Sequence, residues 1–194
     1  MKTLRLSLLS LVLACPGQTP GSIVINEVMY DPPAEQTEWI EIFNDNHYQV
    51  ELSGWTIEDS DSTKPRMITD APLFLAPDEF LCLVQDPAVF LTTFPSVSCP
   101  VLKPVGTWPR LNNSGDHIVL RDARGAVVDR IEYEAEWGGQ NGRSLERVHP
   151  DWPSNEAGTW SSCSPPVLDS LCCQQCFFLI SCQQGIPIGP PQSI

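Results

Sequence analysis

The sequence predicts an all-β protein, either a β-sandwich or a β-barrel. Apolar and polar residues alternate over many short segments, as expected for strands with one buried face. The 19 prolines and 12 glycines recur throughout the 194 residues and separate these segments by turns. Six tryptophans provide large side chains for a β-rich core. Regularly spaced short strands in a chain of this length are typical of a sandwich or a barrel.

The first two expected strands form the clearest part of the pattern. The first covers residues 23–30 and ends before a Pro-Pro pair, since proline cannot donate to a ladder. The second covers residues 38–43, with Ile40 and Ile42 on one face. The opposite face carries Trp39, Glu41 and Phe43. Large apolar groups on both faces indicate a central strand that packs against the opposite sheet on one side.

Further short strands and a single helical turn follow. The expected strands are residues 55–58, 66–69, 73–75 and 80–84. Asp86 is the expected N-cap of a helical turn through residues 89–94, because an Asp side chain accepts hydrogen bonds from the first N–H groups of a helix. No helix longer than a turn or two is required.

The second half contains a predicted hairpin and a final strand. Residues 112–116, Asn-Asn-Ser-Gly-Asp, are typical of a turn that the Asp side chain stabilises. Strands are expected at residues 117–121 and 127–133, joined by a tight turn. Asp129 interrupts the apolar face of the second of these strands, so it requires a hydrogen-bonding or charged partner. We expect that partner to be an Arg of the final strand, residues 143–148.

The N-terminal segment predicts export. In residues 1–14, Lys2 and Arg5 precede an apolar run that is too short to span a bilayer, which is the pattern of a signal peptide. The run ends in Val-Leu-Ala-Cys, which resembles a bacterial lipoprotein box and predicts lipidation of Cys15. The alternative is an ordinary signal peptide cleaved further along. Residues 15–21 are the expected tether, and we expect the protein to be lipid-anchored in the cell envelope or secreted.

The formal net charge of −13 argues against nucleic-acid binding. Affinity for nucleic acid comes mainly from Lys and Arg side chains that neutralise phosphates. This chain has 11 of these residues against 24 acidic ones. We therefore expect no nucleic-acid partner, and membrane contact only through the lipid anchor.

Six short motifs occur along the predicted strands and turns. They are Ile25-Asn26-Glu27-Val28 and residues 38–44, 52–55, 111–120, 128–133 and 142–147. In this order they resemble the lamin tail domain family in its bacterial, exported form. The resemblance implies an immunoglobulin-like β-sandwich with short loops and no long helix, over residues 22–162. It also implies an interaction or scaffold module that binds an unidentified protein or cell-envelope component.

The sequence predicts no enzyme and no catalytic residue. Catalysis needs a convergent set of groups, and histidine is the side chain best suited to proton transfer near neutral pH. His47, His117 and His149 are scattered over a loop, the start of a strand and the C-terminal segment. None of the common nucleophile, metal-ligand or phosphate-loop motifs occurs.

Two groups of charged residues are candidate binding sites. Glu58, Asp59 and Asp61 lie together in a polar loop and could supply oxygen ligands to calcium, although they lack the spacing of an EF-hand. This gives an alternative function, a calcium-binding accessory domain of an extracellular hydrolase system. The simpler interpretation is a solvated loop, with no metal or cofactor bound.

The second candidate group is Arg143, Glu146 and Arg147 in the expected final strand. Arg147 could bind a carboxylate or phosphate in a bidentate manner. The alternative, which we favour, is that these charges pair across strands and fix the register of the final strand.

The cysteines predict disulfides in an exported protein. Cys82 and Cys99 are a plausible pair, since a bond between them closes a loop of moderate length. Residues 163–194 form an expected Cys-rich, poorly ordered tail. Its cysteines superficially resemble zinc ligands, but disulfides are the expected outcome for Cys172, Cys173, Cys176 and Cys182, among themselves or with Cys163.

Overall fold

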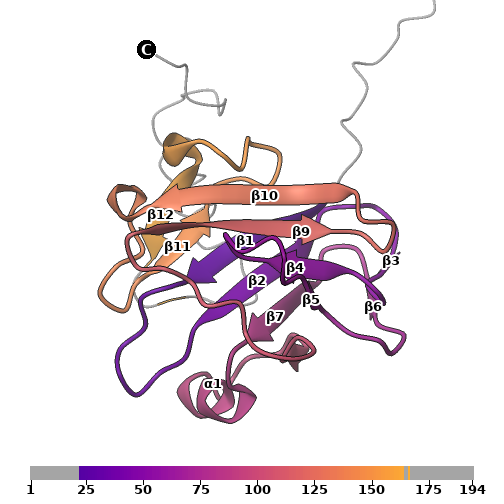
Figure 1. The fold of residues 1–194 in the computed structure, drawn as a ribbon, viewed down its shortest axis with the longest axis horizontal. Coiled ribbons are helices and arrows are strands. Elements are labelled where there is room, and N and C mark those ends of the chain that lie inside the picture. Colours follow the sequence, from indigo (N-terminus) through magenta and orange to yellow (C-terminus); the bar gives the residue numbers. More distant parts are fainter. Residues whose placement is uncertain (1–21, 164–165, 167–194) are drawn as a thin grey trace, which may run out of the picture.

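The computed structural model describes residues 22–163 and residue 166. Two sheets face each other, and a smaller two-stranded sheet lies at one end (Figure 1). The predicted signal peptide, Cys15, the tether and the tail cysteines Cys172, Cys173, Cys176 and Cys182 lie outside the described residues. Cys163, predicted to belong to the poorly ordered tail, is instead a buried strand residue. Within the described part of the chain, no helix has the length and apolar character needed to cross a membrane.

The larger sheet has six strands in the order β12-β11-β1-β2-β7-β8. Its members are β1 (Ile23–Met29), β2 (Trp39–Asn44), β7 (Phe80–Val84), β8 (Val101–Leu102), β11 (Ser144–Arg147) and β12 (Trp160–Cys163). Neighbours are antiparallel except β7 and β8, which are parallel. All residues of β1 and β2 are buried, which confirms the central position predicted for the second strand.

The facing sheet has four strands in the order β10-β9-β4-β5. They are β4 (Thr56–Glu58), β5 (Arg66–Met67), β9 (Gly115–Arg121) and β10 (Val127–Glu134). β9 and β10 form the predicted hairpin, and their residues alternate between buried and less buried positions. The separate two-stranded sheet pairs β3 (Val50–Glu51) with β6 (Phe74–Leu75). The two facing layers confirm the predicted immunoglobulin-like sandwich rather than a barrel.

The main core lies between the two sheets and follows from the alternation of each strand. A β-bulge after Ile25 inserts one extra residue into β1, so the core-facing positions change from Ile23 and Ile25 to Val28 and Tyr30. Tyr30 stacks on Tyr133 of β10 with 4.5 Å between the ring centres. Aliphatic side chains from both sheets fill the remainder, including Ile40, Ile42, Ile57, Leu120 and Leu145.

A second cluster covers the outer face of the six-stranded sheet. The helix α1 (Pro87–Thr93) packs Phe90 against Trp39 of β2, with 5.9 Å between the ring centres. Asp86 caps the helix, because its side chain accepts hydrogen bonds from the backbone N–H groups of Ala88 and Val89 at 2.9 and 3.2 Å. The predicted N-cap is therefore confirmed, and no long helix occurs among the described residues.

Some predicted strand limits are wrong. The segment ending at Val148 is not the final strand, because β12 follows it and pairs with β11 at the edge of the larger sheet. The sequence Trp-Ser-Ser-Cys of β12 has no apolar alternation, so its pattern gave no signal. β3 and β8 were also missed, because strands of two residues are too short to show a period. The expected strand at residues 66–69 is only β5, Arg66–Met67.

Candidate functional site

Arg147 ends β11 and points into the space between the two sheets. Leu145 belongs to the core, and Arg147, two residues further on, projects to the same side. There its Nη1 atom lies 2.8 Å from Oδ2 of Asp129 on β10. Only 4% of the Arg147 side chain and 8% of the Asp129 side chain are exposed. The structure thus confirms the prediction that an Arg of the 143–148 segment is the partner of Asp129.

Both members of the pair make further hydrogen bonds. Nη1 of Arg147 also donates to the carbonyl of Ile25 at 3.3 Å, and Nη2 donates to the carbonyl of Trp152 at 2.6 Å. Asp129 accepts from the backbone N–H of Ile25 at 2.8 Å and from the hydroxyl of Ser154. The pair therefore connects β1, β10, β11 and the segment that follows β11.

This arrangement favours a structural role for Arg147. Its Nη1 and Nη2 atoms already donate to protein acceptors, and its guanidinium carbon lies 5.9 Å from the ring centre of Trp160. A buried guanidinium that is neutralised by a carboxylate has little affinity left for an external anion. Arg147 therefore pairs with a charge on another strand, as in the alternative drawn from the sequence. That strand, β10, belongs to the facing sheet, so the pair does not set the register of β11 as that alternative expected.

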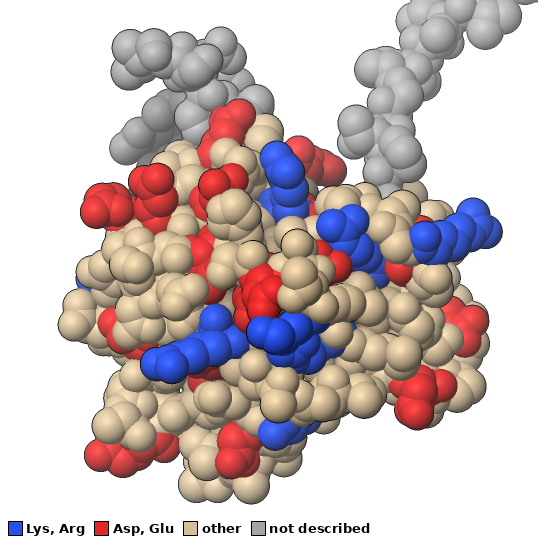
Figure 2. Space-filling model, viewed as in Figure 1, with Lys and Arg blue, Asp and Glu red and all other residues tan. Residues whose placement is uncertain are grey.

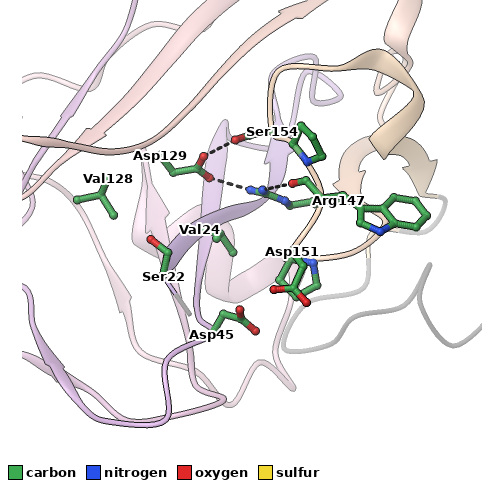
Figure 3. Close-up of a pocket in the computed structure, with 11 residues that line it drawn as sticks. Ser22, Val24, Asp45, Val128, Asp129, Arg147, Asp151 and Ser154 are labelled. Carbon is green, nitrogen blue, oxygen red and sulfur yellow. Dashed lines mark hydrogen bonds and ion pairs between the residues drawn. The ribbon is translucent and has the colours of Figure 1, made fainter. Parts of the chain in front are cut away.

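A pocket of about 320 Å³ lies beside this ion pair (Figure 3). Asp45 and Asp151 line it together with the ion pair, and Figure 3 shows both carboxylates near Val24. Burial raises the pKa of Asp45 above its ordinary value, and the negative charge of Asp151 adds to this effect. The pocket is therefore acidic, which disfavours phosphate and carboxylate ligands.

The other two residues of the predicted binding group lie elsewhere. Arg143 is exposed, and its Nε atom donates to the carbonyl of Gln140 at 3.3 Å. Glu146 is buried on the opposite face of the sheet from Arg147, where its register partner is Glu27. The structure does not bring Arg143, Glu146 and Arg147 together.

The calcium candidates also have separate partners. Glu58 is buried and accepts a hydrogen bond from Nε of Arg121 at 2.8 Å. Asp59 accepts from the backbone N–H of Asp61 at 2.7 Å, which closes a local turn. Hydrogen bonds from Lys64 and Thr63 lower the pKa of Asp61 to about 2. Nothing in this geometry favours calcium, and calcium binding stays a prediction.

Asp116 has the turn-stabilising role that the sequence predicts. One carboxylate oxygen accepts from the backbone N–H groups of Ser60 at 3.1 Å and His117 at 2.8 Å. The other accepts from the backbone N–H of Asn112 at 3.0 Å. The Asp116 carboxylate therefore joins the turn before β9 to the loop after β4.

The three histidines have unrelated surroundings. His47 lies in the loop after β2. His117 on β9 pairs with Glu132 on β10, with 2.9 Å between Nε2 and Oε1. His149 stacks on Trp152 with 5.8 Å between the ring centres. Within residues 22–163, each histidine thus has the setting of a loop or a surface contact.

A row of buried polar residues that was not predicted from the sequence lies on the outer face of the six-stranded sheet. Glu146, Glu27, Glu41 and Cys82 are register partners on four neighbouring strands, β11, β1, β2 and β7. All four side chains are fully buried. The signal in the sequence was weak, because only Glu41 lies between two apolar residues, whereas Glu27 follows Asn26 and Glu146 precedes Arg147. Only the order of the strands shows that they form one row.

The predicted disulfide partners lie next to each other at the end of this row. Sγ of Cys82 and Sγ of Cys99 are 3.2 Å apart, whereas a disulfide bond has a length of about 2.05 Å. The two residues are therefore close enough to be linked, and the disulfide stays a prediction.

The two facing sheets define an immunoglobulin-like β-sandwich domain. Its candidate binding residues bond to other residues of the same domain. The family model of the Lamin Tail Domain matches residues 16–135, and the chain belongs to this family. The family is one of non-catalytic domains with the immunoglobulin-like fold. The match ends before β11, so the Arg147 side of the ion pair lies beyond the matched residues. Comparison with curated proteins gave no match.

Proposed function

We propose that this protein is a non-enzymatic interaction module that is exported from a bacterial cell and anchored by a lipid on Cys15. Membership of a family of non-catalytic domains supports the first part. The signal-peptide pattern and the Val-Leu-Ala-Cys sequence support the second part. The partner is a protein or another component of the cell envelope.

The observation that carries the proposed interaction is a set of exposed apolar side chains at one end of the sandwich. Tyr48, just before β3, is 63% exposed, and Phe74 in β6 is 52% exposed. Val127, at the start of β10, is also exposed. Figure 1 shows β3, β6 and the β9–β10 turn at the end of the molecule where β1 begins. Aromatic side chains are enriched in protein–protein contacts, where they bury a large area at low entropic cost.

The same end of the sandwich is the one joined to the proposed anchor. Ser22 is the first described residue and lines the pocket beside Arg147. A tether of residues 15–21 reaches at most about 25 Å when fully extended. A lipid on Cys15 would therefore hold the domain close to the membrane, with its exposed aromatic end toward the envelope.

The anchor is tested by mass spectrometry of the full-length protein produced in a bacterial host. We expect an N-terminal peptide that starts at Cys15 and carries a diacylglyceryl group. A Cys15→Ser variant should lose this mass and leave the membrane fraction. An unmodified N-terminus further along the wild-type chain would refute the anchor and leave the interaction proposal standing.

The interaction surface is tested by crosslinking the anchored protein in intact cells. Tyr48→Ser and Phe74→Ser should each reduce the yield of one specific crosslinked species. Leu91→Ser is the matched control, because Leu91 is an exposed apolar residue on α1, away from β3 and β6 (Figure 1). A crosslinking pattern that is the same in all three variants would contradict a role for the aromatic end.

A further inference from the structure

The buried row on the outer face of the six-stranded sheet places three carboxyl groups side by side. Glu27 and Glu41 are direct register partners on β1 and β2, and Glu146 is the partner of Glu27 on the other side. Asn26 and Ser144 donate hydrogen bonds to two of these carboxylates. Burial and like neighbours disfavour the ionised form of a carboxyl group, and a cation bound at the end of the row would favour it.

We propose that Cys82, Cys99 and Glu41 form a binding site for a thiophilic divalent cation such as Zn²⁺. Sγ of Cys82 is 3.2 Å from Sγ of Cys99 and 3.9 Å from Oε2 of Glu41. One ligand atom of each of the three residues lies within 4.8 Å of the others. Ligand atoms on a tetrahedral zinc ion are separated by about 3.6–3.8 Å, given bond lengths of about 2.3 Å to sulfur and 2.1 Å to oxygen. To hold the ion, the two sulfurs must therefore move apart by about half an ångström, and Sγ of Cys82 must approach Oε2 of Glu41 by about 0.3 Å.

The strand pairing holds these three ligands in place. Glu41 and Cys82 are register partners on β2 and β7, so their side chains leave the sheet on the same face. The N–H of Cys82 donates to the carbonyl of Pro100 at 3.0 Å, which places Cys99 beside Cys82. Nδ2 of Asn26 donates to Oε1 of Glu41 at 2.9 Å and thereby fixes the orientation of this carboxylate. The opposite oxygen, Oε2, is the one nearer to Cys82.

A surface hollow gives the cation a route to the site. Cys99 is half-buried and lines a hollow of about 270 Å³ together with Asp78 and Glu79. Three protein ligands leave a fourth position on a tetrahedral ion, which water or a partner group can occupy.

The proposed site requires both cysteines in the thiol form. Zinc binds the thiolates, so each cysteine releases its proton to solvent when the ion enters. A disulfide between Cys82 and Cys99 would use the same two sulfurs and remove two of the three ligands. The metal site and the predicted disulfide are thus alternative states of one sulfur pair.

The test uses the full-length protein, reduced with a phosphine, and Zn²⁺ as the probe. Alkylation of each cysteine by N-ethylmaleimide is followed by peptide mass spectrometry, which separates Cys99 from the cysteines of the tail. We expect stoichiometric Zn²⁺ to slow the modification of Cys99 at least about tenfold. Glu41→Gln should raise the zinc concentration needed for protection by about tenfold or more, since loss of even a supporting residue has this effect.

Glu79→Gln is the matched control, because Glu79 lines the hollow without belonging to the ligand set. It should leave protection of Cys99 unchanged. Full reactivity of Cys99 in the presence of Zn²⁺, or equal behaviour of the Glu41 and Glu79 variants, would overturn the site. So would a Cys82–Cys99 disulfide that the phosphine cannot reduce.

A second measurement covers the case in which Cys99 reacts too slowly without metal. Co²⁺ bound by thiolates absorbs in the near ultraviolet, and this absorbance should be lower for Cys99→Ser than for the wild-type protein at equal Co²⁺. Equal absorbance for the two proteins would refute the site independently of any alkylation rate. Neither measurement depends on export, lipidation or a partner, so its outcome is separate from that of the proposed function.

Discussion

At the scale of single residues, the buried pair of Arg147 and Asp129 connects three strands and the segment after β11. Arg147→Met should lower the free energy of unfolding by about 3–5 kcal/mol, because it leaves the Asp129 carboxylate buried without its guanidinium. The carbonyls of Ile25 and Trp152 lose a donor at the same time. Urea denaturation at neutral pH measures the loss.

The control for this substitution is Arg143→Ala. Arg143 is exposed and donates only to the carbonyl of Gln140 among the described contacts, so its loss should change the free energy of unfolding by no more than about 0.5 kcal/mol. The double variant Arg147→Met/Asp129→Asn should recover part of the loss, since no uncompensated charge remains. Equal effects of Arg147→Met and Arg143→Ala would contradict a structural role for the pair.

Glu38 gives a prediction about pH. Its Oε2 accepts hydrogen bonds from Nε1 of Trp108 at 2.7 Å and from the N–H of Leu111 at 3.1 Å. Burial nevertheless raises the pKa of Glu38 above its ordinary value. The folded state therefore binds this proton more tightly than the unfolded state, so the contribution of Glu38 to stability is largest at low pH. It decreases as the pH rises from the ordinary carboxyl value through the raised one.

Glu38→Gln should remove this dependence, because a glutamine side chain keeps an acceptor for both donors and does not ionise. The free energy of unfolding of the wild type minus that of the variant should fall as the pH rises through this window. Urea denaturation at a series of pH values measures the difference. A difference that stays constant or rises with pH would show that the pKa of Glu38 is not raised.

Some single-residue contacts were predictable from the sequence and others were not. Asp129 stands out on an apolar strand face, and the need for a partner leads directly to an Arg of the following strand. The grouping of Glu41, Cys82 and Cys99 depends on β7 pairing with β2 and β8. Strand order is set by the whole core, and no local pattern in these residues reveals it.

At the scale of elements, two glycines with positive φ allow the cost of the backbone conformation to be measured apart from the cost of a steric clash. Gly139 has φ +78°, and a Cβ atom there would lie 2.8 Å from Cβ of Leu145 and 2.9 Å from Cε1 of Tyr30. Gly125, in the β9–β10 turn, has φ +82° with no atom within 4 Å of such a Cβ. The two positions therefore share a backbone conformation and differ in their surroundings.

Gly125→Ala should destabilise the protein by about 1–2 kcal/mol, the ordinary cost of this backbone conformation for an L-residue. Gly139→Ala should cost about 1–3 kcal/mol more, because Leu145 and Tyr30 belong to the core and cannot move freely. Thermal unfolding of the two variants gives the comparison. Equal melting temperatures would show that the chain around Gly139 adapts to a methyl group.

Elements with a strong period were predictable, and short edge elements were not. β1, β2, β9 and β10 each have several apolar residues in alternation, and their positions agree with the sequence pattern. β8 and β12 lie at the two edges of the six-stranded sheet. An edge strand forms where a neighbour offers unpaired backbone groups, which depends on tertiary position more than on the strand's own residues.

At the scale of the whole molecule, charge is unevenly distributed. Figure 2 shows Lys and Arg across the middle of one face and Asp and Glu mainly around its rim. Five basic residues belong to the four-stranded sheet and its connecting loops: Lys64, Arg66, Arg121, Arg124 and Arg130. Some of these pair locally, as Arg121 does with Glu58 and Lys64 with Asp61. The chain as a whole keeps an excess of acidic residues, whose charges repel one another.

This excess of charge predicts how salt affects stability. With a net charge of −13, repulsion between acidic side chains opposes the compact state, and monovalent salt should relieve it by screening. A gain on the order of 1 kcal/mol would raise the melting temperature by about 2–4 °C for a protein of this size.

Calcium chloride at the same ionic strength should give no additional rise, because Glu58, Asp59 and Asp61 have separate partners. Differential scanning calorimetry of the full-length protein, first in sodium chloride and then in calcium chloride, distinguishes the two effects. A further rise in calcium that Asp59→Asn and Asp61→Asn abolish would establish a calcium site in this loop, against the expectation from its geometry.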